Sequence, residues 1–226
     1  MKRFAQLFTE VDQTTKTSQK VAAMARYFED ASDADKLWCI ALFSGRRPKR
    51  AVNTTLLRTW AAERAGIPGW LFGEAYPIVG DLAETITLVL PPAENPQEHS
   101  LSHWIEITKR ILPLDEADKK ATIFAAWDAL ATTPRFLFNK LITGGFRVGV
   151  SQKLMPRALA QATQQDEATL THKLMGNWTP DTITYEALVL ADDPTADLSI
   201  PYPFYLAYQL ENLDELGDIS DWSAEY

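Results

Sequence analysis

The sequence predicts an all-α, multi-helix fold over residues 1–190, with no sheet in its core. In nearly every segment of this range, apolar residues recur at the 3.6-residue period of a helix. Residues that favour helix caps stand at the ends of several segments. The composition, 46% hydrophobic and 23% charged over 226 residues, is that of an ordinary globular protein able to bury a core.

The first third of the chain is expected to contain four helices. They cover residues 4–11, residues 21–28, a segment from Ser32 or Asp33 to a C-cap at Gly45, and residues 53–65 before Gly66.

The basic cluster GRRPKR follows the third expected helix. Pro48 prevents this cluster from continuing the helix, because proline lacks a backbone N–H and clashes with the preceding turn. We therefore expect a loop, or the foot of the next helix, to display Arg46, Arg47, Lys49 and Arg50.

One longer helix is expected in WLFGEAYPIVGDLAETITLVL, residues 70–90. Its β-branched end also fits a strand, but Asp81, Ala83 and Glu84 favour a helix. After the surface connection PPAENPQEHS, further helices are expected over residues 101–111, 115–130, 134–142, 153–162, 168–175 and 185–191.

The stretch LITGGFRVGVSQK is a cation-bearing loop between two expected helices. Gly144 and Gly145 can adopt positive φ and lack a Cβ, so their backbone N–H groups can approach a bulky anion, and Gly149 repeats this feature. Arg147 lies between the glycines, and Ser151 is expected to cap the next helix, whose positive end would face the loop. The pattern suits a phosphate site, and it equally suits an ordinary helical connection with a glycine C-cap.

The charges are unevenly distributed. Although the net charge is −8, residues 36–62 and 129–165 contain no acid and hold eleven of the 22 cations. The cations of the two windows are Lys36, Arg46, Arg47, Lys49, Arg50, Arg58, Arg135, Lys140, Arg147, Lys153 and Arg157. No Lys or Arg follows Lys173, and the last 46 residues carry eleven acids. This distribution indicates a polyanion-binding face on an otherwise acidic protein.

Neither a membrane segment nor a metal site is expected. The N-terminus MKRFAQLFTEVD lacks an apolar signal segment, and no run approaches the ~18 apolar residues that span a bilayer, so we expect a cytoplasmic protein. The single cysteine, Cys39, lies in an apolar run and is expected to be a buried structural thiol. His99 and His103 are four residues apart, but no third ligand accompanies them at metal-motif spacing.

Two segments carry a resemblance to the N-terminal DNA-binding domain of ATP-dependent DNA ligases, and the resemblance runs along most of the chain. LITGGFRVGVSQKLMPRALA, residues 141–160, is similar to the family's pattern of an apolar helix end, glycines, an arginine, a glycine, a small polar residue and a second helix. VGDLAETITLVL, residues 79–90, resembles its other recurrent segment. The opening RFAQLFTEVDQTTKTSQKVAAMARYF resembles bacterial ligases of this group associated with DNA repair.

The resemblance implies a helical DNA-binding domain over residues 1–199. Residues 200–226 would be a linker and the first residues of a truncated nucleotidyltransferase domain, because PYPFYLAYQLE and DWSAEY resemble segments that lead to the family's lysine motif KxDG. No KxDG occurs in the 226 residues. ATP and Mg²⁺ are therefore implied for a longer parent ligase, and we expect this chain alone to hold no cofactor, to contain no catalytic residue and not to self-adenylate.

The implied partner is nicked double-stranded DNA, gripped from the minor-groove side without sequence readout during repair, replication and recombination. The chain would act as a monomer in the bacterial cytoplasm, beside the catalytic domains of the same protein. The residues carried over as the DNA contact are Gly144, Gly145, Arg147, Gly149 and Ser151, with Lys153 flanking them. Phe146 is expected to pack within the protein, and Arg46, Arg47, Lys49 and Arg50 are assigned to a second DNA contact by charge alone.

Two other classes of function remain open from the residues. One is a helical protein–protein adaptor whose basic loops bind an acidic partner. The other is an all-α enzyme acting on a small molecule, although no Ser/His/Asp set, close carboxylate pair or metal motif stands out.

Overall fold

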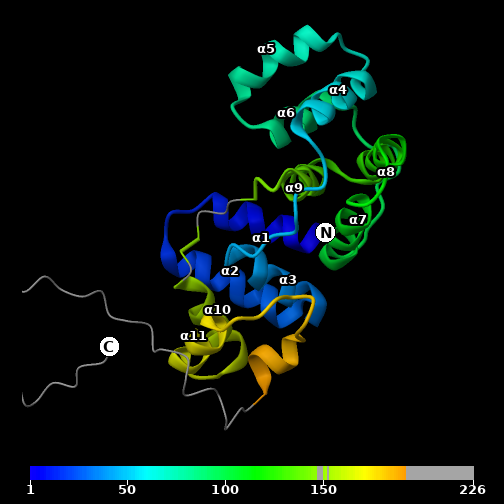
Figure 1. The fold of residues 1–226 in the computed structure, drawn as a ribbon. Coiled ribbons are helices and arrows are strands. Elements are labelled where there is room, and N and C mark those ends of the chain that lie inside the picture. Colours follow the sequence, from blue (N-terminus) through cyan, green and yellow to red (C-terminus); the bar gives the residue numbers. More distant parts are fainter. Residues whose placement is uncertain (147–149, 152, 192–226) are drawn as a thin grey trace, which may run out of the picture. The chain divides into compact units, whose positions relative to one another are not determined.

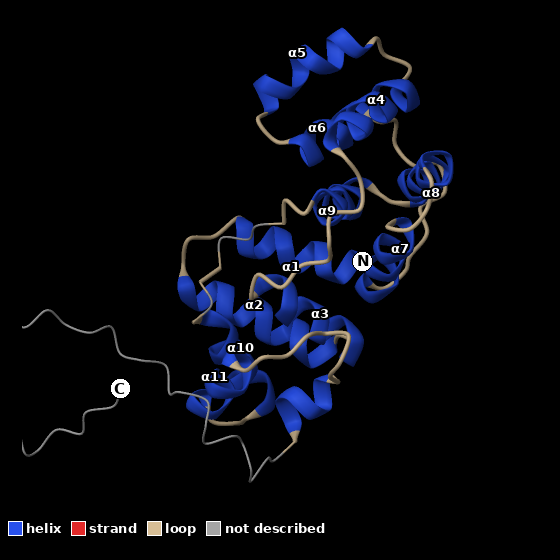
Figure 2. Cartoon of the chain, viewed as in Figure 1, coloured by secondary structure: helices blue, strands red, loops and turns tan. Residues whose placement is uncertain are grey.

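A computed structural model describes residues 1–146, 150, 151 and 153–191 of the chain (Figure 1). Helices make up most of these residues, and none of them lies in a strand (Figure 2). The elements are α1 (Lys2–Asp12), α2 (Thr17–Asp30), α3 (Asp33–Phe43), α4 (Thr54–Ala65), α5 (Gly69–Val79), α6 (Leu82–Val89), α7 (Leu101–Ile111), α8 (Glu116–Ala129), α9 (Thr132–Thr143), α10 (Leu154–Thr163), α11 (Glu167–Met175) and the π-helical turn η1 (Glu186–Leu190). The predicted all-α fold is confirmed.

The chain divides into two compact units, Met1–Asp192 and Asp193–Tyr226, and every described residue belongs to the first. The domain boundary expected near Ile200 lies outside the described residues. No helix in the described part of the chain is long and apolar enough to cross a membrane.

Side-chain caps fix where many of the helices begin. Among the described residues, six helices start after a Ser, Asn or Asp whose side-chain oxygen accepts a hydrogen bond from a backbone N–H of the first turn. This bond satisfies a donor that the helix itself leaves unpaired. These residues are Ser32, Asn53, Asp81, Ser100, Asp115 and Asp166. Gly66 ends α4 in the left-handed conformation, as expected from the sequence.

The prediction of a single helix over residues 70–90 is wrong, because two helices, α5 and α6, occupy this range. Gly80 takes a left-handed φ of 80° and ends α5. Asp81 is extended, and its Oδ1 accepts from the backbone N–H of Glu84 at 2.9 Å to start α6. Gly80 is thus a helix-ending residue, and Asp81 directly after it is a helix-starting residue. The preference for helix over strand in residues 82–89 is confirmed.

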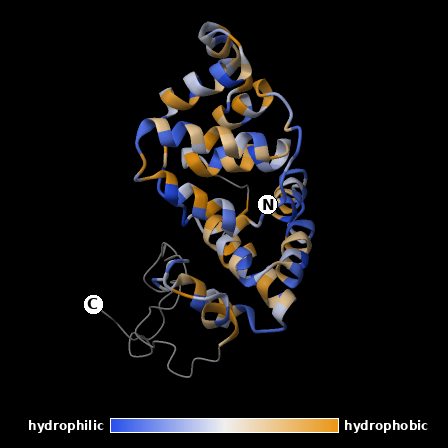
Figure 3. Cartoon of the chain, turned by 90° about the vertical axis from the view of Figure 1, so that its right-hand side faces the viewer, coloured by the Kyte–Doolittle hydropathy of each residue, from blue (hydrophilic) through white to orange (hydrophobic). Residues whose placement is uncertain are grey.

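The helices pack around shared neighbours. α2 packs against α1 and α10, and α10 also packs against α11. α4, α5 and α6 contact one another, and α6 lies on α9, which also contacts α1 and α7 (Figure 1). Hydrophobic residues recur along the helices (Figure 3), and the buried ones form a core that includes the wholly buried Cys39, as predicted.

Polar groups of the core fix α9 in place. Asn139 is fully buried, and its Oδ1 accepts from Trp127 Nε1 on α8 at 2.8 Å. Its Nδ2 donates to Thr87 Oγ1 on α6 at 3.2 Å. Three helices are thus joined by one amide. This amide positions the C-terminal end of α9, after which residues 144–151, here called the glycine segment, begin.

Candidate nucleic-acid interface

The structure brings the two basic windows of the sequence together. The loop between α3 and α4 carries Arg46–Arg50, here called the basic loop, and it runs against the end of α9. The backbone N–H of Ala51 donates to the carbonyl oxygen of Ile142 at 3.2 Å. Arg47 Nη1 donates to the carbonyl oxygen of Gly144 at 3.2 Å, across 97 residues of sequence. The basic loop and the end of α9, which are far apart in the sequence, therefore form one surface.

The basic loop begins with a glycine-based helix end. Gly45 adopts a φ of 82°, and the backbone N–H of Arg46 returns to the carbonyl oxygen of Ala41 at 2.8 Å. Pro48 then keeps the following residues out of helical hydrogen bonding. The predicted loop is confirmed.

Three of the four cations of this loop face solvent. Arg47, Lys49 and Arg50 are exposed, although Arg50 Nε also donates to the carbonyl oxygen of Val52 at 3.1 Å. No acid stands between Asp35 and Glu63, so no carboxylate of the same segment offsets these charges.

Arg46 differs from its neighbours because protein groups engage its guanidinium. It is half-buried, and Nη2 donates to the carbonyl oxygens of Gly176 at 3.0 Å and Leu174 at 3.4 Å. The guanidinium lies over the ring of Trp178, 4.1 Å from its centroid, and burial lowers its pKa. Sequence reasoning missed these partners, because they lie about 130 residues further along the chain and share no motif with the loop.

The glycine segment corrects two expectations from the sequence. Gly144 does adopt a positive φ, 66°, but its N–H donates to the carbonyl oxygen of Leu141 at 3.1 Å and thus caps α9. Gly145 is exposed and does not take a positive φ. The N–H group that Gly144 was expected to offer to an anion is therefore already used by the helix.

The start of α10 also differs from its expected form. Ser151 was expected to be the N-cap, but α10 begins at Leu154, and Lys153 occupies the N-cap position with αR dihedrals. Ser151 instead forms a tight turn, in which its carbonyl oxygen accepts from the N–H of Leu154 at 2.9 Å. Ser151 and Lys153 are both exposed. Arg147 and Gly149, assigned to the same site, lie outside the described residues.

Two cations of the second acid-free window are unavailable to a ligand. Arg135 is only 3% exposed, and its Nη1 donates to the carbonyl oxygen of Pro91 at 2.8 Å. Lys140 forms an ion pair with Asp81. Arg157, on α10, is exposed. Counting cations along the sequence thus overestimates the basic surface of this window.

Phe146 is confirmed as a core residue. It is 1% exposed, and its ring lies 5.8 Å from Phe4 and 5.9 Å from Phe8, measured between centroids. Aromatic packing of Phe146 therefore anchors the glycine segment to α1.

The expected absence of ATP and Mg²⁺ from this chain stays a prediction from the sequence. In the described part of the chain, no group of three or more His, Cys, Asp or Glu side chains is placed to hold a metal ion. His99 and His103 stack on each other with centroids 4.2 Å apart. The 226-residue sequence contains no lysine in a KxDG context.

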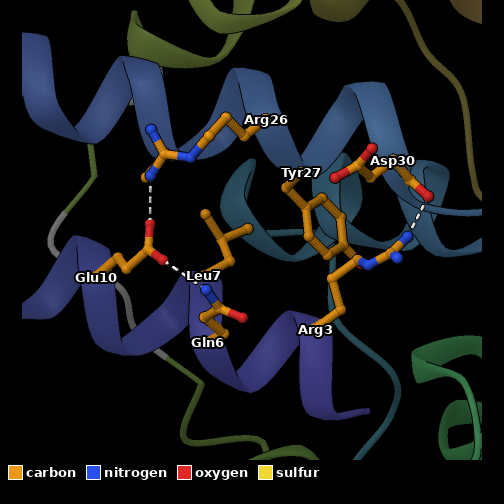
Figure 4. Close-up of a pocket in the computed structure, with 8 residues that line it drawn as sticks. Arg3, Gln6, Leu7, Glu10, Arg26, Tyr27 and Asp30 are labelled. Carbon is orange, nitrogen blue, oxygen red and sulfur yellow. Dashed lines mark hydrogen bonds and ion pairs between the residues drawn. The ribbon is translucent and has the colours of Figure 1, made fainter.

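A pocket of about 330 Å³ between α1 and α2 is a second cluster of charged residues (Figure 4). Arg26 Nη2 lies 2.6 Å from Glu10 Oε2, and Arg3 donates to the backbone carbonyl of Asp30. The charges in this pocket neutralise one another, so it lacks the net positive charge of the basic loop.

These features define a class of protein: an all-helical domain that presents an exposed basic loop against a glycine helix end. The family model described as DNA ligase N terminus matches residues 1–160, which include α1 to α9, the basic loop and the glycine segment. The chain therefore belongs to this family and contains the N-terminal domain of an ATP-dependent DNA ligase. A search of curated proteins found no match.

Proposed function

We propose that this chain binds duplex DNA through the sugar–phosphate backbone, at the surface where the basic loop meets the glycine helix end. The observation that carries the proposal is the hydrogen bond from Arg47 Nη1 to the Gly144 carbonyl oxygen, which joins the two basic windows into one surface. Membership of the DNA ligase N terminus family supports DNA as the polyanion.

The chemistry of the loop favours phosphate contact over base readout. Arg47, Lys49 and Arg50 are three exposed cations within four residues, and closely spaced cations of this kind neutralise phosphates without reading base edges. Such contacts grip DNA of any sequence. In this proposal Arg46 positions the loop from inside, because its guanidinium is held by α11 and Trp178.

The remaining proposed contacts lie around the start of α10. Ser151 and Lys153 are exposed there and would extend the contact along the backbone, together with Gly145. Arg147 and Gly149 belong to the same proposed site. The preferred substrate is a nicked duplex approached from the minor-groove side, and the role is to hold the nick for sealing by a longer ligase in repair and replication. The chain acts as a monomer, and ATP and Mg²⁺ serve the other domains of that ligase.

Binding of a fluorescent nicked duplex, measured at several salt concentrations, tests the proposal. The three exposed cations of the basic loop, together with Lys153 and Arg147, make five phosphate contacts in this proposal and predict a slope of log affinity against log salt of about −4.5. Intact duplexes of two unrelated sequences serve as substrates for comparison, and polyglutamate serves as an acidic competitor. Comparable binding of both sequences with this slope is the expected result. A flat salt response contradicts the proposal, whereas displacement of the DNA by polyglutamate at equal charge favours an adaptor for acidic proteins.

A further inference from the structure

A cavity of about 500 Å³ lies between the basic loop and the chain that follows α11. Residues 46–49 of the basic loop, Trp38 of α3, Leu112 at the end of α7 and residues 177–181 line it, and we call it the loop cavity. Its volume falls within the ~300–1,000 Å³ that is usual for pockets that bind small molecules. The loop cavity is therefore large enough for a ligand.

The cations that line the loop cavity outnumber its carboxylates. Arg46, Arg47 and Lys49 line it, and within the described part of the chain none of the three forms an ion pair. Among the described residues, Asp181 is the one carboxylate of the lining, and it pairs with Lys109. The loop cavity thus carries a positive charge that its own carboxylate does not offset.

The environment of Arg46 indicates where an anion binds. Its guanidinium is half-buried, and within the described residues the groups that contact it are neutral: the carbonyl oxygens of Leu174 and Gly176 and the ring of Trp178. A charge that is withdrawn from water costs free energy unless an opposite charge or hydrogen bonds compensate it. The two hydrogen bonds use Nη2, so Nη1 and Nε remain as donors for a ligand. An anion in the loop cavity supplies the missing opposite charge.

The rest of the lining favours an anion that carries a ring. Trp38 and Trp178 are 7% and 6% exposed, so their side chains are held within the fold. Pro48, Leu112 and Pro180 extend this apolar wall. An inorganic anion gains nothing from such a wall, whereas a ring system gains by removing apolar surface from water. A phosphate monoester, with a charge of about −1.5 to −2 at pH 7, also offsets more of the three unpaired cations than one carboxylate does.

We propose that the loop cavity binds a nucleoside monophosphate, with its phosphate at Arg46 and Lys49 and its base and sugar against the apolar wall. This group occurs both as a free nucleotide and at the end of a DNA strand. The loop cavity shares Arg47 and Lys49 with the proposed DNA contact. Binding of a free nucleotide does not depend on that contact, so failure of one proposal is distinguishable from failure of the other.

Calorimetric titration of the full chain with dAMP, in a buffer without phosphate, tests the proposal. We expect a Kd of about 1 mM or tighter. Inorganic phosphate and deoxyadenosine, which each lack one half of the ligand, are both expected to bind about tenfold more weakly or worse. Absence of dAMP binding overturns the proposal. Equal affinity for inorganic phosphate, which indicates an anion site only, or equal affinity for deoxyadenosine also overturns it.

Variants then locate the site. Arg46→Gln is expected to lower the affinity for dAMP by about tenfold, because a hydrogen bond between two charged groups is lost. Lys49→Gln, at an exposed position, is expected to lower it as well, whereas Arg157→Gln, which removes a cation of α10 outside the loop cavity, leaves it unchanged. Thermal unfolding checks the fold of each variant, and Lys49→Gln decides the result if Arg46→Gln does not fold. An affinity for Lys49→Gln equal to that for Arg157→Gln overturns the proposal.

A 5′-phosphorylated dinucleotide separates the two sources of the ligand. Tighter binding of the dinucleotide than of dAMP assigns the loop cavity to a strand end, and weaker binding assigns it to a free nucleotide. Both results support the proposal if Lys49→Gln weakens the binding. Dinucleotide binding that Lys49→Gln leaves unchanged contradicts it.

Discussion

Arg47 Nη1 donates a hydrogen bond to the carbonyl oxygen of Gly144 at 3.2 Å, so a cation of the basic loop lies at the C-terminal end of α9. The last carbonyl groups of a helix lack partners within the helix, and the helix end carries partial negative charge. An arginine at this position satisfies one such carbonyl and holds the loop against α9. The remaining N–H groups of its guanidinium stay available to a phosphate.

We expect Arg47→Gln to weaken DNA binding and to lower the magnitude of the salt slope by about one, because one phosphate contact is lost. The matched control is Lys120→Gln, which also removes one cation and one contact, here between Lys120 and Glu63 at 2.7 Å. Fluorescence anisotropy at several salt concentrations measures both variants. Equal affinity and equal slope for the two variants would place the DNA contact elsewhere.

Gly144→Ala is expected to destabilise the fold by about 1–2 kcal/mol, the cost of a left-handed conformation for a residue with a Cβ. The cost is conformational rather than steric, because the nearest atom to an added Cβ, Arg50 Cβ, would be 3.8 Å away. Gly73→Ala is the control, since Gly73 lies within α5 at negative φ with open space around it. Urea unfolding should show that this second change is neutral or stabilising.

Asn139→Ala is expected to lower the free energy of unfolding by roughly 1–3 kcal/mol. The change leaves the buried Nε1 of Trp127 without the acceptor that it now has at 2.8 Å. Chemical denaturation followed by tryptophan fluorescence measures the loss. A change within about 0.5 kcal/mol, as at an ordinary surface site, would show that this amide does not join α8 and α9 energetically.

Local patterns predicted the helices well because each pattern is read within a few residues. The helix expected over residues 101–111 is α7, and its residues at helical spacing are buried: Leu101, Trp104, Ile105, Thr108 and Ile111. Ser32 at the start of α3 and Gly66 at the end of α4 are also confirmed, whereas the C-cap of α3 is Ser44 and not Gly45, which follows it with a φ of 82°. The break at Gly80 was missed because the apolar period continues across it, although Gly followed by Asp is itself a local signal.

The site was less predictable, because its geometry depends on contacts between distant residues. Nothing near Arg135 in the sequence indicates that its guanidinium is buried against the carbonyl of Pro91, 44 residues earlier. No local sequence pattern predicts the contact between Arg47 and Gly144 either. Charge counting therefore locates the cations along the sequence, but only the fold separates exposed cations from those used within the protein.

The ion pair between Asp81 and Lys140 predicts a pH-dependent stability. Burial on its own raises the pKa of Asp81, but the hydrogen bonds from Lys140 and the backbone N–H of Glu84 outweigh it, so the pKa lies below its usual value of 3.8. The unfolded chain therefore binds a proton at higher pH than the folded chain does. The stabilisation is fully present above pH 3.8 and is lost as the pH falls through the folded-state pKa.

Asp81→Asn isolates this effect, because asparagine still caps a helix but cannot pair with Lys140. The variant is expected to be less stable than wild type by about 1 kcal/mol at pH 7, the upper range for a partly exposed ion pair. The difference should shrink as the pH is lowered below 3.8 and the wild-type carboxylate is protonated. Urea unfolding at pH 7, 5 and 3 measures it, and Lys140→Gln should add no further loss in the Asp81→Asn background. A difference that stays constant down to pH 3 would show that the carboxylate charge of Asp81 does not stabilise the junction between α6 and α9.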